Sequence, residues 1–290
     1  MSDKTQNKDQ QKVSFFRRLT HSFSQMTVET SISREAYETS RGIGIQIKNL
    51  CKSFNGQPVL KNISLEIKPG EIFSIIGASG TGKSVLLRHL AKLLKPDSGE
   101  ILIDNENINF EPGVMVEQKY RYSMVFQTSA LFNSLTVGEN IGLWLREKDV
   151  LPERRIRRVI RDKLRLVGLE GRESMPIADL SGGMKKRVAI ARSLAMNPDL
   201  IFYDEPTAEL DPVTTDELAR VINNLKDKVN LTTIIVSHDL NFALYLSDRV
   251  AMMHEGEIIE VGTPDEIKKS VNPLVRRFLY TTTKGIQGKR

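Results

Sequence analysis

The stretch "EIFSIIGASGTGKSVLLRHL", from Glu71 to Leu90, decides the fold of this chain. Its first part is almost entirely apolar, which is typical of a strand buried inside a parallel sheet. A helical pattern starts at Lys83 and runs to Leu94, where "KPDSG" ends it. Between the two, "GASGTGKS" matches the phosphate-binding pattern G-x-x-x-x-G-K-[ST] in full. Because the loop follows a strand and precedes a helix, the sequence predicts a nucleotide site rather than a chance turn.

Size and composition limit what the rest of the chain can be. It has 290 residues, of which 40% are hydrophobic and 27% charged, as in ordinary globular proteins. The single cysteine, Cys51, excludes an internal disulfide and a cysteine-based metal cluster. No apolar run approaches the length that spans a bilayer, and the N-terminus lacks the apolar core of a secretory signal. If the protein works at a membrane, we expect other chains to cross it.

Short apolar runs alternate with helical patterns along most of the chain, which predicts an α/β fold. Such alternation indicates a parallel sheet with helices on both faces. We expect strands at 43–50, 63–67, 71–77, 101–105, 122–127, 199–206 and 232–239. We expect the further helices at 136–147, 152–167, 183–195 and 214–228.

Four of these strands end in residues that suit phosphate chemistry. In open parallel sheets, ligands bind beyond the carboxyl ends of the strands, so the terminal residues of neighbouring strands gather at one edge. The ends in question are Gly77 with its loop, Gln127, the pair Asp204 and Glu205, and His238.

Each residue at this edge has an expected role. The glycines let the backbone N–H groups of the loop point at phosphate oxygens, and the helix dipole adds to their effect. Lys83 is expected at the β- and γ-phosphates, and Ser84 and Asp204 at Mg²⁺. Glu205 is expected to orient and polarise the attacking water. The loop residues are Gly77, Ala78, Ser79, Gly80, Thr81, Gly82, Lys83 and Ser84.

Three more residues carry open alternatives. His238 is expected at the γ-phosphate or at the attacking water. Gln127 is expected to complete the Mg²⁺ shell or to report on the γ-phosphate. Phe54, in "CKSFNG", is either a stacking surface for adenine or a residue of the core.

A second glycine loop lies in "DLSGGMKKRVAIAR", Asp179 to Arg192. A helix that begins at such a loop binds anions through its first amides and its dipole, here with Ser181, Gly182 and Gly183. Only one complete nucleotide loop exists in the chain. The second loop therefore suggests a nucleotide held by another copy in a two-fold dimer, which composition alone does not establish.

Two further segments each allow two interpretations. The basic run from Glu153 to Arg165 is either a surface for nucleic acid or anionic lipid, or a solvated face of an amphipathic helix. We favour the helix face, because Ile156, Val159, Ile160 and Leu164 have the required spacing. The segment from Val13 to Met26 is either a short amphipathic helix or part of a mobile tail.

From Gly44 to about Gly262 the chain resembles the nucleotide-binding subunits of ATP-binding-cassette (ABC) transporters. The resemblance rests on ordered motifs: Phe54, "GASGTGKS", Gln127, "LSGG", "DLIFYDEP", "AELDP" and His238. It implies a P-loop ATPase domain at 43–262 with a parallel core sheet, an antiparallel β subdomain and a helical subdomain at about 128–182. Residues 1–42 would be an extension and 263–290 a helical tail.

The resemblance also implies a mechanism and cofactors. ATP with Mg²⁺ would lie between the phosphate loop of one subunit and the "LSGG" of the other in a homodimer. Hydrolysis would open the dimer. Asp211 matches the aspartate that passes between the two sites.

The chain departs from the usual family motifs at two positions, and the first of them, Met184, narrows the subfamily. Met184 stands where "LSGGQ" has glutamine, and Glu209 replaces a small residue in "AELDP". The stretch "LSGGMKKRVAIARSLA", together with "FQTSALFNSLTVGENI" and "NPLVRRFL", resembles the ATPases of Mla/Mce-type phospholipid transport. That implies permease chains, an MCE-type substrate-binding protein, a peripheral place on the cytoplasmic face of the inner membrane, and no nucleic-acid partner.

The subfamily resemblance raises two structural expectations. Leu131, Phe132 and Leu135 either line a groove for a permease helix or belong to the core. The tail is expected to form an amphipathic helix with Leu274, Phe278 and Leu279 on one face, and to stabilise the dimer.

Other functions stay open at this point. The same ATPase could serve another cargo, such as a lipoprotein, an amino acid or an organic solvent. A cassette ATPase acting on DNA or ribosomes is disfavoured, because the sequence has no coiled-coil insertion and no second cassette. A non-hydrolysing module is disfavoured because Lys83, Asp204, Glu205 and His238 are all present.

Overall fold

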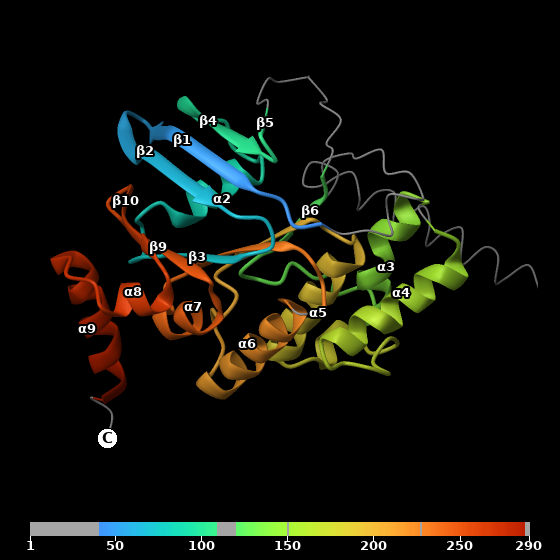
Figure 1. Ribbon diagram of the computed structural model, residues 1–290. Helices are drawn as coiled ribbons and strands as arrows, with labels where there is room; N and C mark the ends of the chain where they lie inside the picture. The colour runs from blue at the N-terminus through green and yellow to red at the C-terminus, as the bar shows by residue number, and fades with distance from the viewer. Residues whose placement is uncertain (1–40, 109–119, 150, 227, 288–290) are drawn as a thin grey trace, which may run out of the picture. The chain divides into compact units, whose positions relative to one another are not determined.

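A computed structural model describes residues 41–108, 120–149, 151–226 and 228–287 (Figure 1). The segment from Val13 to Met26 lies outside these residues, as does nearly all of the expected N-terminal extension. The first described residues are held to the fold. The Arg41 backbone N–H donates to Asp199, and Ile43 and the Thr232 hydroxyl exchange hydrogen bonds.

The larger sheet has six strands in the order β10-β9-β3-β8-β7-β6. Strands β9, β3, β8, β7 and β6 are parallel neighbours, and only β10 runs antiparallel, to β9. The predicted parallel core is therefore confirmed. The bounds are β3 Ile72–Ile76, β6 Tyr122–Val125, β7 Leu200–Asp204, β8 Thr232–Ser237, β9 Arg249–His254 and β10 Glu257–Gly262.

Two strands of this sheet are absent from the sequence-based prediction. Strands β9 and β10 form a hairpin around Glu255 and Gly256, both of which have positive φ. Strand β6 also ends two residues earlier than expected, so Gln127 lies in the turn that follows it.

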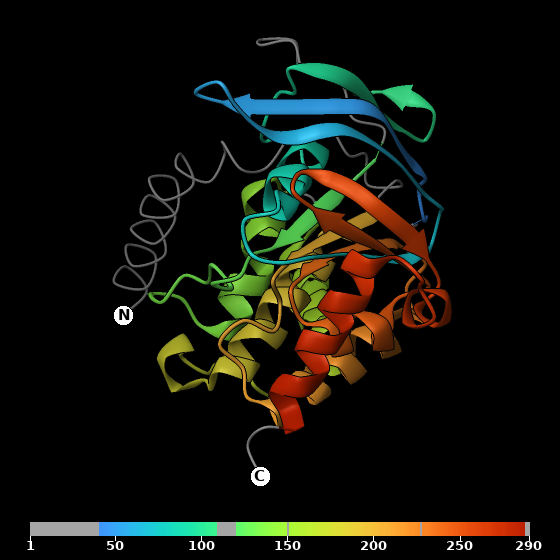
Figure 2. The same cartoon turned by 90° about the vertical axis from the view of Figure 1, so that its left-hand side faces the viewer.

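The second sheet is antiparallel, in the order β2-β1-β4-β5, and it confirms the β subdomain. Its strands are β1 Ile45–Phe54, β2 Gln57–Ile67, β4 Ser98–Ile103 and β5 Glu106–Asn107. Helix α2, Lys83–Leu90, lies between the two sheets (Figures 1 and 2). Its buried leucines, Leu86, Leu87 and Leu90, share one apolar cluster with residues of both sheets.

The remaining helices cover the other face of the larger sheet and its β9–β10 edge (Figure 1). They are α3 Val137–Glu147, α4 Glu153–Leu166, α5 Gly182–Ala195, α6 Pro212–Lys226, α7 Leu240–Leu246, α8 Pro264–Lys268 and α9 Pro273–Gln287, with a short 3₁₀ turn at Ile177–Asp179. Helix α2 ends four residues before the predicted Leu94, because Lys92 adopts a left-handed backbone.

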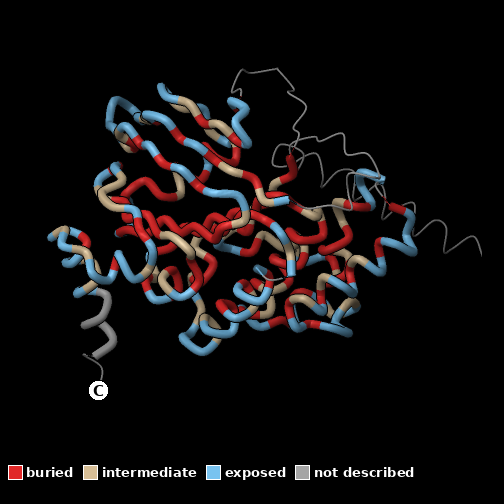
Figure 3. Tube along the Cα trace, viewed as in Figure 1, coloured by how far each residue is buried: buried red, intermediate tan, exposed pale blue. Residues whose placement is uncertain are grey.

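Strand alternation divides the core between the two faces of the sheet. In β7, Leu200 and Phe202 face α2, while Ile201 and Tyr203 face the helices on the opposite side. Burial on both faces is visible as the continuous buried trace through the centre of Figure 3. This explains why the central strands are apolar runs rather than alternating patterns.

Helix α4 is the amphipathic helix that its spacing predicts. Ile156, Ile160 and Leu164 are buried and the arginines of the helix are exposed, whereas Lys163 is half-buried beside the apolar face. Arg157 pairs with Glu153, and Arg158 pairs with Asp162, one helical turn apart.

Helix α9 packs differently from the prediction. Val275 is buried and forms a cluster with residues of α7 and β9, and Phe278 and Leu279 pack against it. Leu274, in contrast, is 40% exposed. Leu274 is four residues before Phe278 but stays at the exposed margin of that face, and the buried residue is Val275, which has the i+3 and i+4 spacing to Phe278 and Leu279.

Candidate functional site

The loop after β3 has the backbone geometry that a phosphate cradle needs. Gly77, Gly80 and Gly82 all have positive φ. A Cβ on Gly77 would lie 2.2 Å from the Met253 carbonyl oxygen, so no other residue fits there without a shift. Gly82 caps α2 in a left-handed conformation, with φ of 100°. The chain thus turns directly from a buried strand into a helix whose amides face the loop.

Lys83 is the first residue of α2, and its side chain turns back into the loop. Its ammonium donates to the carbonyl oxygens of Gly77 and Ala78, both at 2.9 Å. The side chain is only 5% exposed. Burial lowers the pKa of Lys83, and the carboxylates of Glu205 and Asp204 offset part of that shift. The carboxylate that compensates this buried cation, that of Glu205, lies 4.0 Å away. The Lys83 ammonium is therefore suited to bind an anionic ligand.

Ser84 connects α2 to the end of β7. Its hydroxyl donates to Asp204 Oδ1 at 2.8 Å. A hydroxyl and a carboxylate side by side supply hard oxygen ligands of the kind that Mg²⁺ takes. In the part of the chain that the structure describes, no group of three or more acidic, histidine or cysteine side chains could hold a metal.

Glu205 and His238 form the second pair at the edge. Glu205 Oε2 lies 2.7 Å from His238 Nδ1 and also accepts from the His238 backbone N–H at 3.2 Å. Because an ionised carboxylate only accepts, Nδ1 carries the proton in this pair. Glu205 has φ of 48°, a left-handed backbone that its N–H bond to the Val236 carbonyl holds in place.

Sheet topology explains why these residues meet. Strand β8 lies between β3 and β7, so His238 follows the strand that separates the phosphate loop from Asp204. The structure therefore brings together Lys83, Ser84, Asp204, Glu205 and His238. We refer to these five residues as the edge cluster.

Two other predicted site residues, Gln127 and Phe54, have no side-chain hydrogen bond or ion pair to the edge cluster within the described chain. The side chain of Gln127 is exposed, and no hydrogen bond joins it to Ser84 or Asp204. Phe54 is 42% exposed at the end of β1, so the core alternative for it is wrong. One face of its ring has the Lys52 ammonium 5.5 Å from the centroid, and Asp97 holds Lys52 at 2.7 Å.

The second glycine loop is a helix cap in this chain. Ser181 caps α5 by accepting the Met184 backbone N–H at 3.2 Å. The Met184 side chain packs against the core, so its apolar character has a local reason. Ser181 and Gly182 are exposed.

The start of α5 also contacts the start of α6. Gly183 is buried, and a Cβ there would lie 2.3 Å from the Thr214 methyl. Thr214 is fixed in turn, because its N–H and hydroxyl donate to Asp211 at 3.0 and 2.5 Å. These two bonds lower the pKa of the Asp211 carboxyl.

The segment after Gln127 is anchored by side chains that the sequence analysis does not single out. Asn140 of α3 is fully buried, accepts the Phe132 N–H, and donates to three carbonyls of residues 132–136. Leu135 is buried and Leu131 packs partly against the core. Lys186 and Arg192 of α5 donate to carbonyls of residues 127–130. The spacing in the sequence could have predicted that Lys186 is buried. It lies three residues after buried Gly183 and four before buried Ile190, on the same face of α5.

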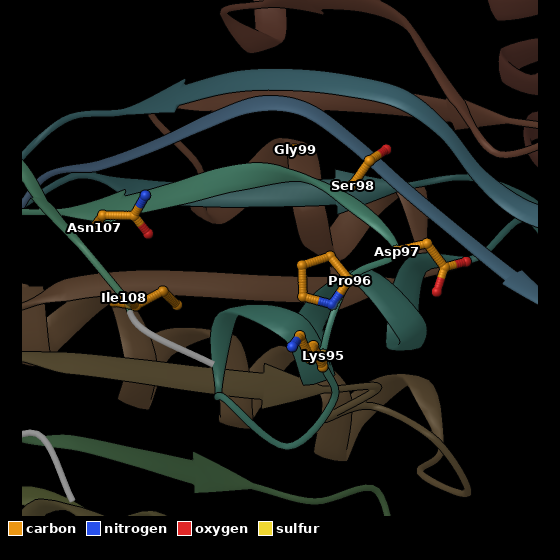
Figure 4. Close-up of a pocket in the computed structure, with 7 residues that line it drawn as sticks. All are labelled: Lys95, Pro96, Asp97, Ser98, Gly99, Asn107 and Ile108. Carbon is orange, nitrogen blue, oxygen red and sulfur yellow. The ribbon is translucent and has the colours of Figure 1, made fainter. Parts of the chain in front are cut away.

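A cavity of about 490 Å³ lies elsewhere, at the start of β4 (Figure 4). It contains none of the predicted site residues. Its one carboxylate, Asp97, is already held by Lys52 and by the Ser53 backbone N–H. We therefore assign it no chemistry. Its lining residues are Lys95, Pro96, Asp97, Ser98, Gly99, Asn107 and Ile108.

The strand–loop–helix unit, the buried Lys83 ammonium and the Ser84–Asp204 pair at one sheet edge define a P-loop nucleotide-binding protein. The comparisons with known proteins narrow this class. Residues 60–208 match the model of the ABC transporter family. The chain belongs to the ABC transporter family, whose ATP-binding proteins are ATPases that use ATP with Mg²⁺.

Two curated relatives illustrate the similarity. The spermidine/putrescine import ATP-binding protein PotA of Thermotoga maritima is 44% identical over 82% of this chain and 64% of its own length. The intermembrane phospholipid transport ATP-binding protein MlaF of Haemophilus influenzae is 36% identical over 83% of this chain and 92% of its own length. The chain thus spans less than two thirds of the PotA relative but nearly all of MlaF.

A solved structure gives the same fold. The ATP-binding cassette MJ0796, in a dimeric post-hydrolysis state with ADP and phosphate, has a TM-score of 0.67 and 33% identity, covering 76% of this chain and 98% of its own. Within the described residues of the present chain, no helix is long and apolar enough to cross a membrane.

Proposed function

We propose that this protein is the ATP-hydrolysing subunit of an ABC transporter that moves phospholipid between membranes through separate permease chains. The observation that carries the ATPase part is the edge cluster, which combines a buried cation, a hydroxyl–carboxylate pair and a carboxylate–histidine pair. Its residues fit a magnesium-bound triphosphate, because each supplies a group that such a ligand needs.

In this proposal, bound MgATP supplies the phosphoryl group that is transferred to water. Lys83 neutralises phosphate charge from the floor of the loop, where the Gly77 and Ala78 carbonyls hold its ammonium. Ser84 and Asp204 would hold Mg²⁺ with their oxygens, which lie 2.8 Å from each other. The amides from Ser79 to Ser84 would donate to phosphate oxygens, and Thr81 holds the turn through its hydroxyl's bond to the Ala78 carbonyl.

Glu205 orients the attacking water and withdraws its proton, and His238 assists. The Nδ1–H of His238 donates to Glu205 Oε2, which leaves His238 Nε2 free to accept a proton or to contact the γ-phosphate side. Gln127 would join this site only by a movement of its side chain toward Ser84. We propose Phe54 as the adenine platform, since its ring is exposed at the end of β1.

We further propose that two copies pair head to tail. Ser181, Gly182 and the start of α5 would then meet the nucleotide held by the other copy, with Asp211 between the sites. Two observations support this. Ser181 and Gly182 are exposed at a helix N-terminus, and the similar cassette MJ0796 is dimeric with ADP and phosphate.

For the cargo, the MlaF relative supports phospholipid. Its match extends over 92% of that protein, whereas a third or more of the PotA relative has no counterpart in the match. The proposed partners are then permease chains and an MCE-type substrate-binding protein, with the ATPase on the cytoplasmic face of the inner membrane. The second candidate is polyamine import, which the 44% identity to PotA favours.

One experiment separates the two cargoes. The protein is purified with its native membrane partners, and the bound small molecules are identified by mass spectrometry. ATP hydrolysis is then measured with phospholipid vesicles and with spermidine. Copurified phospholipid and stimulation by vesicles support the proposal. Stimulation by spermidine alone, or no magnesium-dependent hydrolysis by the complex, refutes it.

A further inference from the structure

Helix α5 inserts two cationic side chains into the turn that follows Gln127. The Lys186 ammonium donates to the Gln127 carbonyl oxygen, and the Arg192 guanidinium donates to those of Ala130, at 2.7 Å, and Ser129, at 3.2 Å. Three hydrogen bonds therefore tie the backbone of one turn to one helix. We refer to residues 127–130 as the Gln127 turn.

This turn needs outside support. Ser129 and Ala130 have φ of 62° and 45°, a left-handed backbone that L-residues with a side chain seldom adopt. Such residues persist only where the surrounding structure holds them in place. Within the turn, the Ser129 N–H donates to the Phe126 carbonyl at 2.9 Å. The bonds from α5 supply the remaining restraint.

Lys186 is also an unusual residue to find at this position. Its side chain is 5% exposed, and an ammonium buried to that degree requires compensation. The Gln127 carbonyl is its single hydrogen-bond acceptor among the described residues. Burial lowers the pKa of Lys186, and the charge of Glu209 offsets part of that shift. Glu209 is one of the residues that depart from the usual family motifs, and its charge acts on Lys186.

The helix also fixes where the turn lies relative to the second glycine loop. Lys186 follows Ser181 by five residues on the same helix, about 7.5 Å along its axis at 1.5 Å per residue. A helix of this length is rigid on the scale of one turn. The Gln127 backbone and the capped start of α5 therefore belong to one mechanical unit.

We propose that Lys186, with Arg192, is a positioning residue that fixes the Gln127 turn to α5 and thereby sets where Gln127 stands relative to the edge cluster. The inference rests on the proposed ATPase function. Lys186 itself touches no reacting group, and it acts through Gln127.

The test is a double-mutant cycle with the full-length protein and its native partners. Lys186→Met removes the charge and the donor at nearly constant length, and Gln127→Ala removes the side chain that Lys186 is proposed to position. We expect Lys186→Met to lower kcat about tenfold or more, as displaced catalytic groups do, with little change in KM for MgATP. In the Gln127→Ala background it should have almost no further effect. Lys186→Arg, which keeps the donor, should restore most of the rate.

Lys185→Met is the matched control, because the Lys185 side chain makes no hydrogen bond or ion pair in the described part of the chain. A second readout needs no ATP: hydrogen exchange of the Ser129 amide should be faster in Lys186→Met than in Lys185→Met. If Lys186→Met does not fold, Lys186→Gln enters the same cycle.

The outcomes are distinct from those for the proposed function. A wild-type protein without ATPase activity refutes the function, whereas an unchanged kcat in Lys186→Met with an active wild type overturns the inference. If Lys186→Met lowers kcat by the same factor in the wild-type and Gln127→Ala backgrounds, the inference is overturned too, because Lys186 would then act independently of Gln127. Hydrogen exchange of the Ser129 amide that is equally fast in Lys186→Met and Lys185→Met also overturns the inference.

Discussion

Replacing Glu205 with glutamine tests the edge cluster most directly. The substitution keeps the size of the side chain and one oxygen that accepts from the His238 N–H, but it removes a negative charge 4.0 Å from the Lys83 ammonium. Two unit charges at that distance interact by roughly 4 kcal/mol at an effective dielectric constant of 20. Both side chains are largely buried, at 5% and 14% exposure, so solvent screens this interaction only weakly.

Two opposite effects follow from that loss. Without ATP, Lys83 loses part of the charge that offsets its burial, so the unliganded protein should become less stable. With MgATP, the phosphates supply that charge and the repulsion from Glu205 is gone, so binding should be as tight as in the wild type or tighter. Hydrolysis should fall by about 10²–10⁴-fold, the range for loss of a general base.

The assay compares ATP affinity by calorimetry, phosphate release, and the mass of the particle in solution with and without MgATP. Glu217→Gln is the control, because this carboxylate on α6 is half exposed and pairs with Arg187 at 3.9 Å. We expect Glu205→Gln to bind ATP, to stop turnover and to accumulate as a dimer. Turnover at the wild-type rate would contradict the role of Glu205. A variant that stays monomeric with MgATP and the membrane partners would contradict the shared-nucleotide dimer.

Further predictions concern stability, the dimer and the base. Asn140→Ala should lower the free energy of unfolding by about 3 kcal/mol in urea denaturation, because buried backbone groups lose their partners, and equal stability would contradict the anchoring. Gly183→Ala should reduce ATP-dependent dimerisation, measured by light scattering, because the new methyl meets Thr214 at 2.3 Å; Thr214→Ser should restore it, and no rescue would reject the steric cause. Phe54→Ala should weaken ATP binding about tenfold in calorimetry, the usual value for a stacked base, and an unchanged dissociation constant would remove Phe54 from the site. Ending the chain before Pro273 removes α9 and should weaken dimerisation, as seen by sedimentation, whereas unchanged association and transport would remove that role.

The sequence predicts the centre of the fold well because its local patterns agree with the tertiary arrangement. The run from Ile72 to Ile76 is buried on both faces, so composition alone identifies it as a central strand. The phosphate loop then fixes which strand end carries the site. Asp204 and His238 follow at neighbouring strands, because parallel strands bring their carboxyl ends to one edge.

The sequence predicts less where long-range packing decides the outcome. Leu274 has an apolar side chain, as core residues do, but it is exposed. Val275 occupies the position that packs against α7 and β9. Lys186 carries a charge that suggests solvent, yet it is buried against a carbonyl in a turn 59 residues earlier. Neither fact follows from periodicity over one helix, because each depends on which turn lies opposite.

The two glycine loops differ in what they already hold, and this difference argues for two copies. Around the phosphate loop, a buried cation and a hydroxyl follow β3, two carboxylates lie at the end of β7, and a histidine follows β8, all within hydrogen-bond or ion-pair distance of one another in pairs. The loop at Ser181 has only its own helix cap. A helix N-terminus alone binds an anion weakly, since its dipole is worth no more than about 2 kcal/mol. It becomes useful when the anion is already held elsewhere, as a nucleotide gripped by the edge cluster of another copy would be. In the proposed dimer the weaker loop would contact the γ-phosphate, so hydrolysis would release the partner before it releases the nucleotide.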